Sequence, residues 1–181
     1  MNKYCIFSLA ATIFLLATTS CKNQQRNTIV SEGNKNGILH FGNQTEPEDL
    51  DPHIVTGVPE FHILQSLFEG LVTPDPRDLH PLPGVAHSWD ISEDNLVYTF
   101  HLRPDATWSN GETVKAGDFV FSFQRILSPG LGSEYAYMLY CIENAEKYHK
   151  SVLKDFTRVG ARAADDTTLI IRLGSSTPYF M

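Results

Sequence analysis

The strongest constraint on the fold is a run of alternating side chains near the middle of the chain. Large apolar residues alternate there with smaller or polar ones: Val97, Tyr98, Thr99, Phe100, His101 and Leu102. A period of two predicts a half-buried β-strand over 97–103. The turn-forming cluster at 92–95 separates this strand from a second short run at 88–91, which predicts an antiparallel hairpin.

Apolar spacing, capping residues and turn signals predict the other elements of a mixed α and β domain. The expected helices run from Pro59 to Gly70, from Asp118 to Ser128, over 134–140 and over 143–149. The expected strands are a first strand at 38–43 and a second hairpin formed by 156–164 and 168–173. The proline-rich stretch 73–83 is expected to be an irregular surface loop.

The first twenty residues have the organisation of a bacterial secretory signal. One positive charge, Lys3, precedes the apolar run 5–17 and the small residues 18–20. The apolar run is shorter than the roughly 20 residues needed to span a bilayer. Cys21 follows directly and resembles a lipobox cysteine, so we expect it to be acylated and to become the mature N-terminus. Secretion without lipid and an uncleaved anchor are the alternatives.

Changes in composition predict the domain organisation. Residues 1–20 are the expected signal peptide, and the polar segment 21–37 is an expected flexible, lipidated tether. Residues 38–181 then form the incomplete start of a globular domain. The chain ends on Tyr-Phe-Met directly after a Thr-Pro helix-start signal, so we expect an N-terminal fragment of a longer protein.

Charge and cysteine usage exclude several classes of partner and site. Lys and Arg total 14 against 21 Asp and Glu, so the formal net charge of −7 argues against a nucleic-acid partner. Once the signal is removed and Cys21 is acylated, Cys141 has no cysteine to pair with, and its apolar neighbours predict a buried, inert thiol. The histidines show no ligand spacing, so no metal site is expected.

No catalytic motif accompanies these features. The chain has no Gly-x-Ser-x-Gly elbow, no His-Glu-x-x-His pair and no phosphate-binding Gly-x-x-x-x-Gly-Lys loop. A secreted hydrolase is therefore the weaker alternative, and we expect a protein without enzymatic activity.

A long block of motifs resembles the family 5 extracellular solute-binding proteins, the peptide-binding subunits of ABC importers. The resemblance is carried by Trp89, the strand 98–103, Trp-Ser-Asn-Gly at 108–111 and Ala-Gly-Asp-Phe-Val-Phe-Ser at 116–122. Further motifs follow in the family's order at 50–53, 57–60, 67–71 and 177–180. Together they cover nearly all of residues 38–181.

The resemblance implies an α/β (mixed α+β) two-lobed fold of the periplasmic-binding-protein type. The chain would hold the start of the first lobe and an added β-rich subdomain. The implied function is capture of oligopeptides for an ABC permease and its ATPase, in the periplasm or at the cell surface. We expect a monomer, anchored to the membrane through Cys21 and without a cofactor. The same fold with another ligand (a nickel chelate, haem or a cell-wall peptide) or a ligand-sensing role remains open.

The resemblance also implies three ligand-binding residues. Thr56 and Val58 match a loop whose main chain pairs with the peptide, and Tyr135 matches an aromatic residue that faces it. Relatives in the oligopeptide branch usually carry an acidic residue at the position of Thr56, so a charge contact there is in doubt. The carboxylate that would pair with the peptide ammonium belongs to the second lobe. From the residues alone, Val58 is instead a loop residue packed beside a helix. For Tyr135, a core position at helical spacing and a ligand-facing position are equal alternatives.

Other prominent residues have structural interpretations. Five aromatic residues are predicted to lie in the core: Trp89, Phe100, Trp108, Phe119 and Phe123. Three charged residues are predicted to form ion pairs or helix caps: Arg103, Asp118 and Arg125.

Overall fold

The computed structural model describes residues 21–181, so the predicted signal peptide lies outside the described residues. The contacts divide the chain into two units, with the boundary between Gln44 and Thr45. Among residues 21–181, no helix combines the length and the apolar character required to cross a bilayer.

The described part of the first unit contains helix α2 (Cys21–Asn36), where the sequence predicts a flexible tether. The helix ends before Gly37, whose φ of +66° suits a helix terminus. The strand expected at 38–43 is wrong, because these residues have irregular structure. A strand requires a hydrogen-bonding neighbour, and no strand among residues 21–181 pairs with this segment.

A four-stranded antiparallel sheet organises the second unit. Its order is β3 (Ala86–Ile91), β4 (Val97–Leu102), β6 (Thr168–Arg172) and β5 (Ala161–Ala163). Both predicted hairpins are confirmed, β3 with β4 and β5 with β6. The 156–164 strand is shorter than expected, because the Asp155 side chain accepts a hydrogen bond from the Thr157 amide and turns the chain into the 3-10 helix η2 (Phe156–Arg158).

The core lies on one face of this sheet. Tyr98 pairs with Ile171 and Phe100 with Leu169, and all four side chains are buried. These cross-strand pairs explain why the alternation in β4 fixes its register. Helix α4 (Ala116–Ile126) packs against β5 and β6.

Helix α4 begins two residues before the predicted start. Asp118 stands in its first turn and accepts a hydrogen bond from the Lys115 amide at 2.9 Å. The predicted capping role of Asp118 is therefore confirmed. Trp108 is 42% exposed, so its predicted core position is wrong. Its indole Nε1 instead donates to Asp118 at 3.1 Å, which holds the ring at the surface.

The other predicted aromatic residues contribute to the core. Phe100 is buried, and Trp89, Phe119 and Phe123 pack against the buried cluster. The prediction that 73–83 is an irregular loop is wrong, because β1 (Val72–Pro74) and β2 (Pro81–Pro83) form an antiparallel pair. The prolines stand at the ends of these short strands, where a missing N–H costs least.

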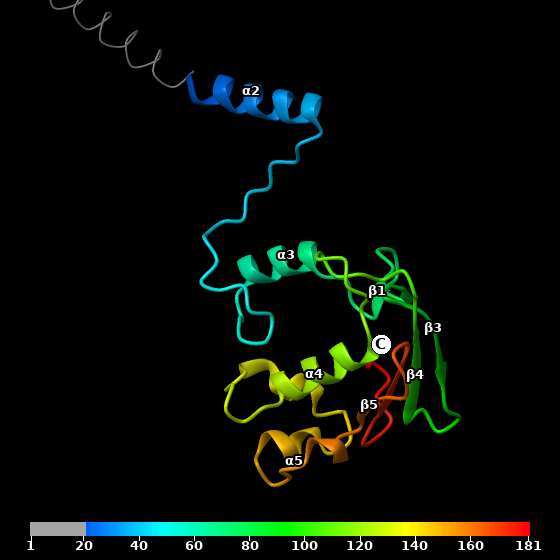
Figure 1. Ribbon diagram of the computed structural model, residues 1–181. Coiled ribbons are helices and arrows are strands. Elements are labelled where there is room, and N and C mark those ends of the chain that lie inside the picture. The colour runs from blue at the N-terminus through cyan, green and yellow to red at the C-terminus, as the bar shows by residue number, and fades with distance from the viewer. Residues whose placement is uncertain (1–20) are drawn as a thin grey trace, which may run out of the picture. The chain divides into compact units, whose positions relative to one another are not determined.

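Three further helical segments complete the second unit. Helix α3 (Val58–Leu67) confirms the helix expected before Gly70. The pair expected at 134–149 is present as the 3-10 helix η1 (Glu134–Leu139) and the short α5 (Ala145–His149). In Figure 1, the loop that leads into α3 lies beside the end of α4.

Candidate functional site

The candidate site is built on the loop that precedes α3. Its first part is a tight turn, in which the Asp51 carbonyl accepts hydrogen bonds from the Ile54 and Val55 amides at 3.1 and 3.2 Å. The Asp51 side chain also accepts from the His53 amide at 3.0 Å. Short polar side chains form such turns readily, so the sequence Leu-Asp-Pro-His fixes the local conformation.

An ion pair holds this turn against α4. Arg125 donates to Asp51 through both terminal nitrogens, with 2.8 Å between Nη1 and Oδ1 and a second contact between Nη2 and Oδ2. Hydrogen bonding to the Arg125 guanidinium lowers the pKa of the Asp51 carboxyl to about 2. The predicted ion-pairing role of Arg125 is confirmed, and Arg103 likewise pairs with Glu69 at 2.5 Å.

His53 forms a second set of contacts between this turn and α4. Its Nδ1 lies 2.7 Å from Arg125 Nη1, and its Nε2 lies 2.9 Å from Ser122 Oγ. Because arginine only donates, Nδ1 is the acceptor, and the ring proton stands on Nε2, where it is donated to Ser122. Burial and the charge of Arg125 lower the pKa of this imidazole, against the opposing effect of Asp51.

The far end of the loop is tied to η1. The Tyr135 hydroxyl donates to the Thr56 carbonyl at 3.3 Å. Two of the three predicted ligand-binding residues, 79 positions apart in the chain, are therefore in contact. Tyr135 is 41% exposed and Val58 is 58% exposed, so neither is a core residue in the described part of the chain.

The main chain between Thr56 and Val58 is extended. Gly57 has φ −85° and ψ 152°, which are β-type angles. The carbonyl of residue 56 and the amide of residue 58 then face the same side, with the spacing used by one residue of an added parallel strand. The Val58 N–H is in the first turn of α3, where amides have no helical acceptor. The Thr56 carbonyl retains a second lone pair beside the Tyr135 contact.

The buried side chain of Glu60 lies next to this segment. Glu60 is 5% exposed, and its Oε1 accepts from the Glu48 amide at 2.8 Å. A Cβ at Gly57 would lie 2.0 Å from Glu60 Oε2, so a side chain at residue 57 would require the Glu60 carboxylate to move. Neither feature was expected from the sequence.

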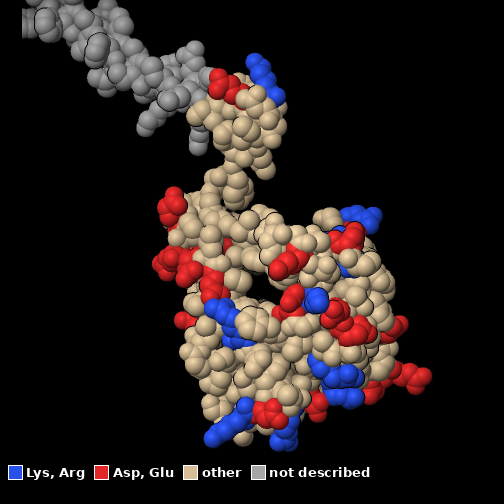
Figure 2. Space-filling model, in the orientation of Figure 1, with Lys and Arg blue, Asp and Glu red and all other residues tan. Residues whose placement is uncertain are grey.

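A pocket of about 520 Å³ lies beside this loop. Its lining includes Thr56 and four acidic residues: Glu46, Glu48, Asp49 and Glu60. No lysine or arginine lines it, and Figure 2 shows acidic side chains gathered over the segment before α3. The surroundings of Thr56 are therefore negative, although Thr56 itself carries no charge.

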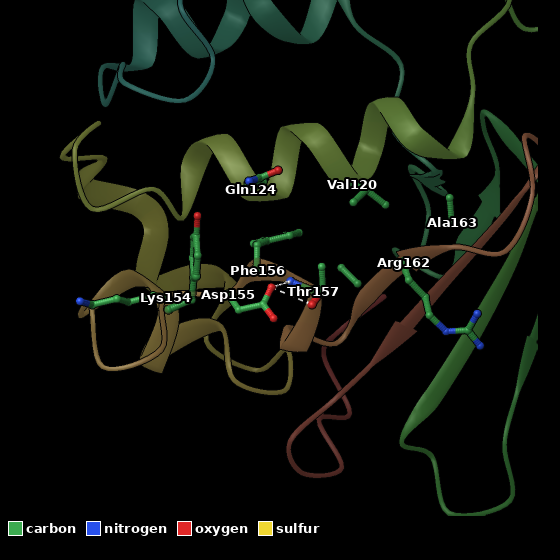
Figure 3. A pocket seen from close by; sticks show the side chains of 10 residues that line it. Val120, Gln124, Lys154, Asp155, Phe156, Thr157, Arg162 and Ala163 are labelled. Carbon is green, nitrogen blue, oxygen red and sulfur yellow. Dashed lines mark hydrogen bonds between the residues drawn. The ribbon is translucent and has the colours of Figure 1, made fainter.

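A second pocket, also of about 520 Å³, lies between α4 and the segment that contains η2 and β5. Figure 3 shows Val120 and Phe156 facing its interior, whereas the charged ends of Lys154 and Arg162 extend away from it. Its lining includes polar and charged side chains, but no predicted ligand-binding residue is among them. The candidate site is therefore assigned to the loop before α3, where Thr56 lines the first pocket.

A further cluster of potential metal-ligand side chains already forms ion pairs. Asp75, Asp78 and His80 place one potential metal-ligand atom each within 4.8 Å of one another. However, Arg77 binds both oxygens of Asp75, at 3.0 and 2.8 Å, and His80 pairs with Asp78 at 2.5 Å. Cys141 is partly buried, which raises the pKa of its thiol and supports the prediction of an inert group.

The sequence alone did not identify the partners of this site. The motif at 50–53 and Arg125 both stand out as signature residues, but their contact spans 74 positions. Covariation between these positions would be the signal able to reveal it.

Residues 80–181 match the family model described as bacterial extracellular solute-binding proteins, family 5 Middle. The chain is 47% identical over 140 residues to the periplasmic oligopeptide-binding protein OppA of Escherichia coli, an alignment that covers 76% of this chain and 25% of that protein.

Solved structures agree with that match. The crystal structure of Haemophilus influenzae OppA in complex with RPPGFSPFR has a TM-score of 0.71 at 39% identity, covering 76% of this chain and 27% of that one. The Escherichia coli murein tripeptide binding protein MppA has a TM-score of 0.70 at 39% identity, covering 75% and 26%. The chain spans about a quarter of the length of the curated relatives it matches.

Proposed function

Because the chain belongs to the bacterial extracellular solute-binding proteins, family 5, we propose that it is part of a protein that captures oligopeptides and delivers them to an ABC-type importer. Members of this family are binding components of transporters and not enzymes. We assign the chain a binding role and no catalytic step.

The observation that carries this proposal is the extended main chain at residues 56–58, between the exposed residues Thr56 and Val58. An added peptide strand would donate to the Thr56 carbonyl and accept from the Val58 amide. Every peptide offers these backbone groups, so such pairing supports affinity without dependence on the ligand's side chains. The Tyr135 ring, half exposed beside Thr56, offers an apolar face and a hydroxyl to the same ligand.

A cell-wall peptide is the second candidate ligand. It is favoured by the similarity to the murein tripeptide binding protein of Escherichia coli, which is close to that found for the oligopeptide-binding relative. Both ligands share the backbone groups that residues 56–58 would recognise, so the loop alone does not separate them.

We extend the proposal to the location and partners of the protein. Cys21 follows the predicted signal directly and would carry the lipid that anchors the protein to the membrane, in the periplasm or at the cell surface. The permease and ATPase of the importer would be its partners, and the binding protein would act as a monomer.

The test is calorimetry on the complete product of the gene without residues 1–20. Di- to pentapeptides and a murein tripeptide are titrated separately. Heat of binding with unmodified peptides supports the oligopeptide assignment, and heat with the murein tripeptide alone supports the second candidate. The absence of heat with every peptide would contradict both.

A further inference from the structure

The loop that carries Thr56 and Val58 has an anchor that the proposed function does not by itself require. Between residues 51 and 57 it contacts α4 through Asp51 and His53, and η1 through Thr56. Asp51 and His53 are partly buried, whereas Thr56 and Val58 are exposed. The contacts of the partly buried Asp51 and His53 therefore set the position of the exposed residues Thr56 and Val58.

His53 is the member of this anchor that can change its charge near neutral pH. Its neutral ring accepts from Arg125 through Nδ1 and donates to Ser122 through Nε2, so both ring nitrogens are used. A proton on Nδ1 would face the Arg125 guanidinium, and the acceptor would be lost. The two Arg125 contacts, to Asp51 and to His53, cannot both persist in that state.

The charges that act on His53 are few. Within residues 21–181 they are Asp51 on its own turn and Arg125 on α4, while the facing Ser122 hydroxyl is neutral. The pKa of His53 is lowered, since burial and Arg125 outweigh Asp51. The neutral ring is thus the form that fits the native contacts.

We propose that His53 is a positioning residue for the ligand loop: its neutral ring locks residues 54–58 onto α4, and protonation of the ring releases the loop and weakens peptide binding. This inference rests on the proposed peptide-binding role. It adds a regulation that follows the pH of an extracytoplasmic compartment, because a histidine loses its neutral form as the pH falls.

The experiment measures peptide affinity by calorimetry at pH 7.5 and pH 5.0 for the complete gene product. We expect affinity about threefold to tenfold weaker at the lower pH, since a proton bound preferentially by the released loop competes with the ligand. The His53→Gln variant keeps an amide that can donate to Ser122 and cannot be protonated, so its affinity should change little with pH. The His80→Gln variant, at an exposed histidine beside Asp78, is the matched control and should keep the wild-type pH dependence.

A second readout is independent of any ligand. Amide hydrogen exchange of residues 54–58, corrected for intrinsic rates, should be faster in His53→Ala than in wild type at pH 7.5, and should be restored in part by His53→Gln. Equal exchange in wild type and His53→Ala, or an unchanged pH dependence of affinity in His53→Gln, would overturn the inference. If no peptide binds at any pH, the proposed function fails, and the exchange data alone decide whether His53 positions the loop.

Discussion

Arg125 on α4 binds Asp51, 74 positions earlier in the chain, through both terminal nitrogens of its guanidinium group. The pair fixes the turn that leads into α3 and thereby the loop that carries Thr56 and Val58. A bidentate contact between an arginine and a carboxylate fixes the relative orientation of the two groups as well as the distance between them. A long-range ion pair therefore determines where the candidate ligand loop lies.

Asp51→Asn should lower the free energy of unfolding by about 1–2 kcal/mol at pH 7, because it removes charge from hydrogen bonds that are partly shielded from water. Urea unfolding of the complete gene product checks this value. Asp105→Asn, at an exposed aspartate in a turn, is the matched control and should leave the urea midpoint unchanged. Equal effects of the two substitutions would contradict the role of the Asp51 pair.

The contribution of Asp51 should also depend on pH. Its pKa is about 2 in the folded protein against an ordinary value of 3.8, so the folded state binds fewer protons than the unfolded state between these values. The stabilisation is therefore complete above about pH 4 and is lost as the pH falls toward 2. The stability difference between wild type and Asp51→Asn should shrink over that interval, as urea unfolding at a series of pH values would show. A difference that stays constant down to pH 2 would refute the assignment.

Val58→Pro should weaken peptide binding about tenfold, because proline deletes the N–H that the proposed ligand strand would use and leaves a peptide carbonyl unpaired. The substitution suits the local backbone, since the first turn of a helix accepts proline and Gly57 is already extended. Val58→Ala, which keeps the N–H, is the control and should bind nearly as tightly as wild type in calorimetry. Equal affinities of the two variants would show that the Val58 amide takes no part in binding.

Gly57→Ala should destabilise the protein by about 1–3 kcal/mol, since the new methyl group would displace the Glu60 carboxylate from its bond with the Glu48 amide. Gly117→Ala on α4 is the control. Nothing lies within 4 Å of a Cβ placed there, so this exchange should be neutral or stabilising. Thermal unfolding of both variants distinguishes the outcomes, and similar melting temperatures would argue against the close approach at Gly57.

Cys21→Ser should move the protein from the membrane fraction to the soluble extracytoplasmic fraction, because serine cannot form the thioether that carries the lipid. Cell fractionation and mass spectrometry of the mature N-terminus provide the measurement. Cys141→Ser, which changes a partly buried cysteine of the second unit, should leave the distribution unchanged. If wild type and Cys21→Ser fractionate alike, the protein is not anchored through this residue.

Local pattern was enough to predict most of the second unit. The alternation in β4, the turn clusters beside both hairpins and the apolar spacing of α3 and α4 each reflect contacts between residues close in sequence. The errors occurred where neighbours distant in sequence decide the outcome. The prolines at 74, 81 and 83 favour a loop locally, but antiparallel pairing of Thr73 with Leu82 makes two short strands.

The sequence by itself determined the hairpins, the helices α3 and α4 and the residue types of the candidate loop, because capping, turn chemistry and side-chain period act over a few residues. Only the tertiary structure decided how that loop is held. The contacts of Arg125 with Asp51, His53 with Ser122 and Tyr135 with Thr56 join segments at least 69 positions apart. No local pattern encodes such contacts, since they arise when the packing of α4 and η1 brings separate parts of the chain together.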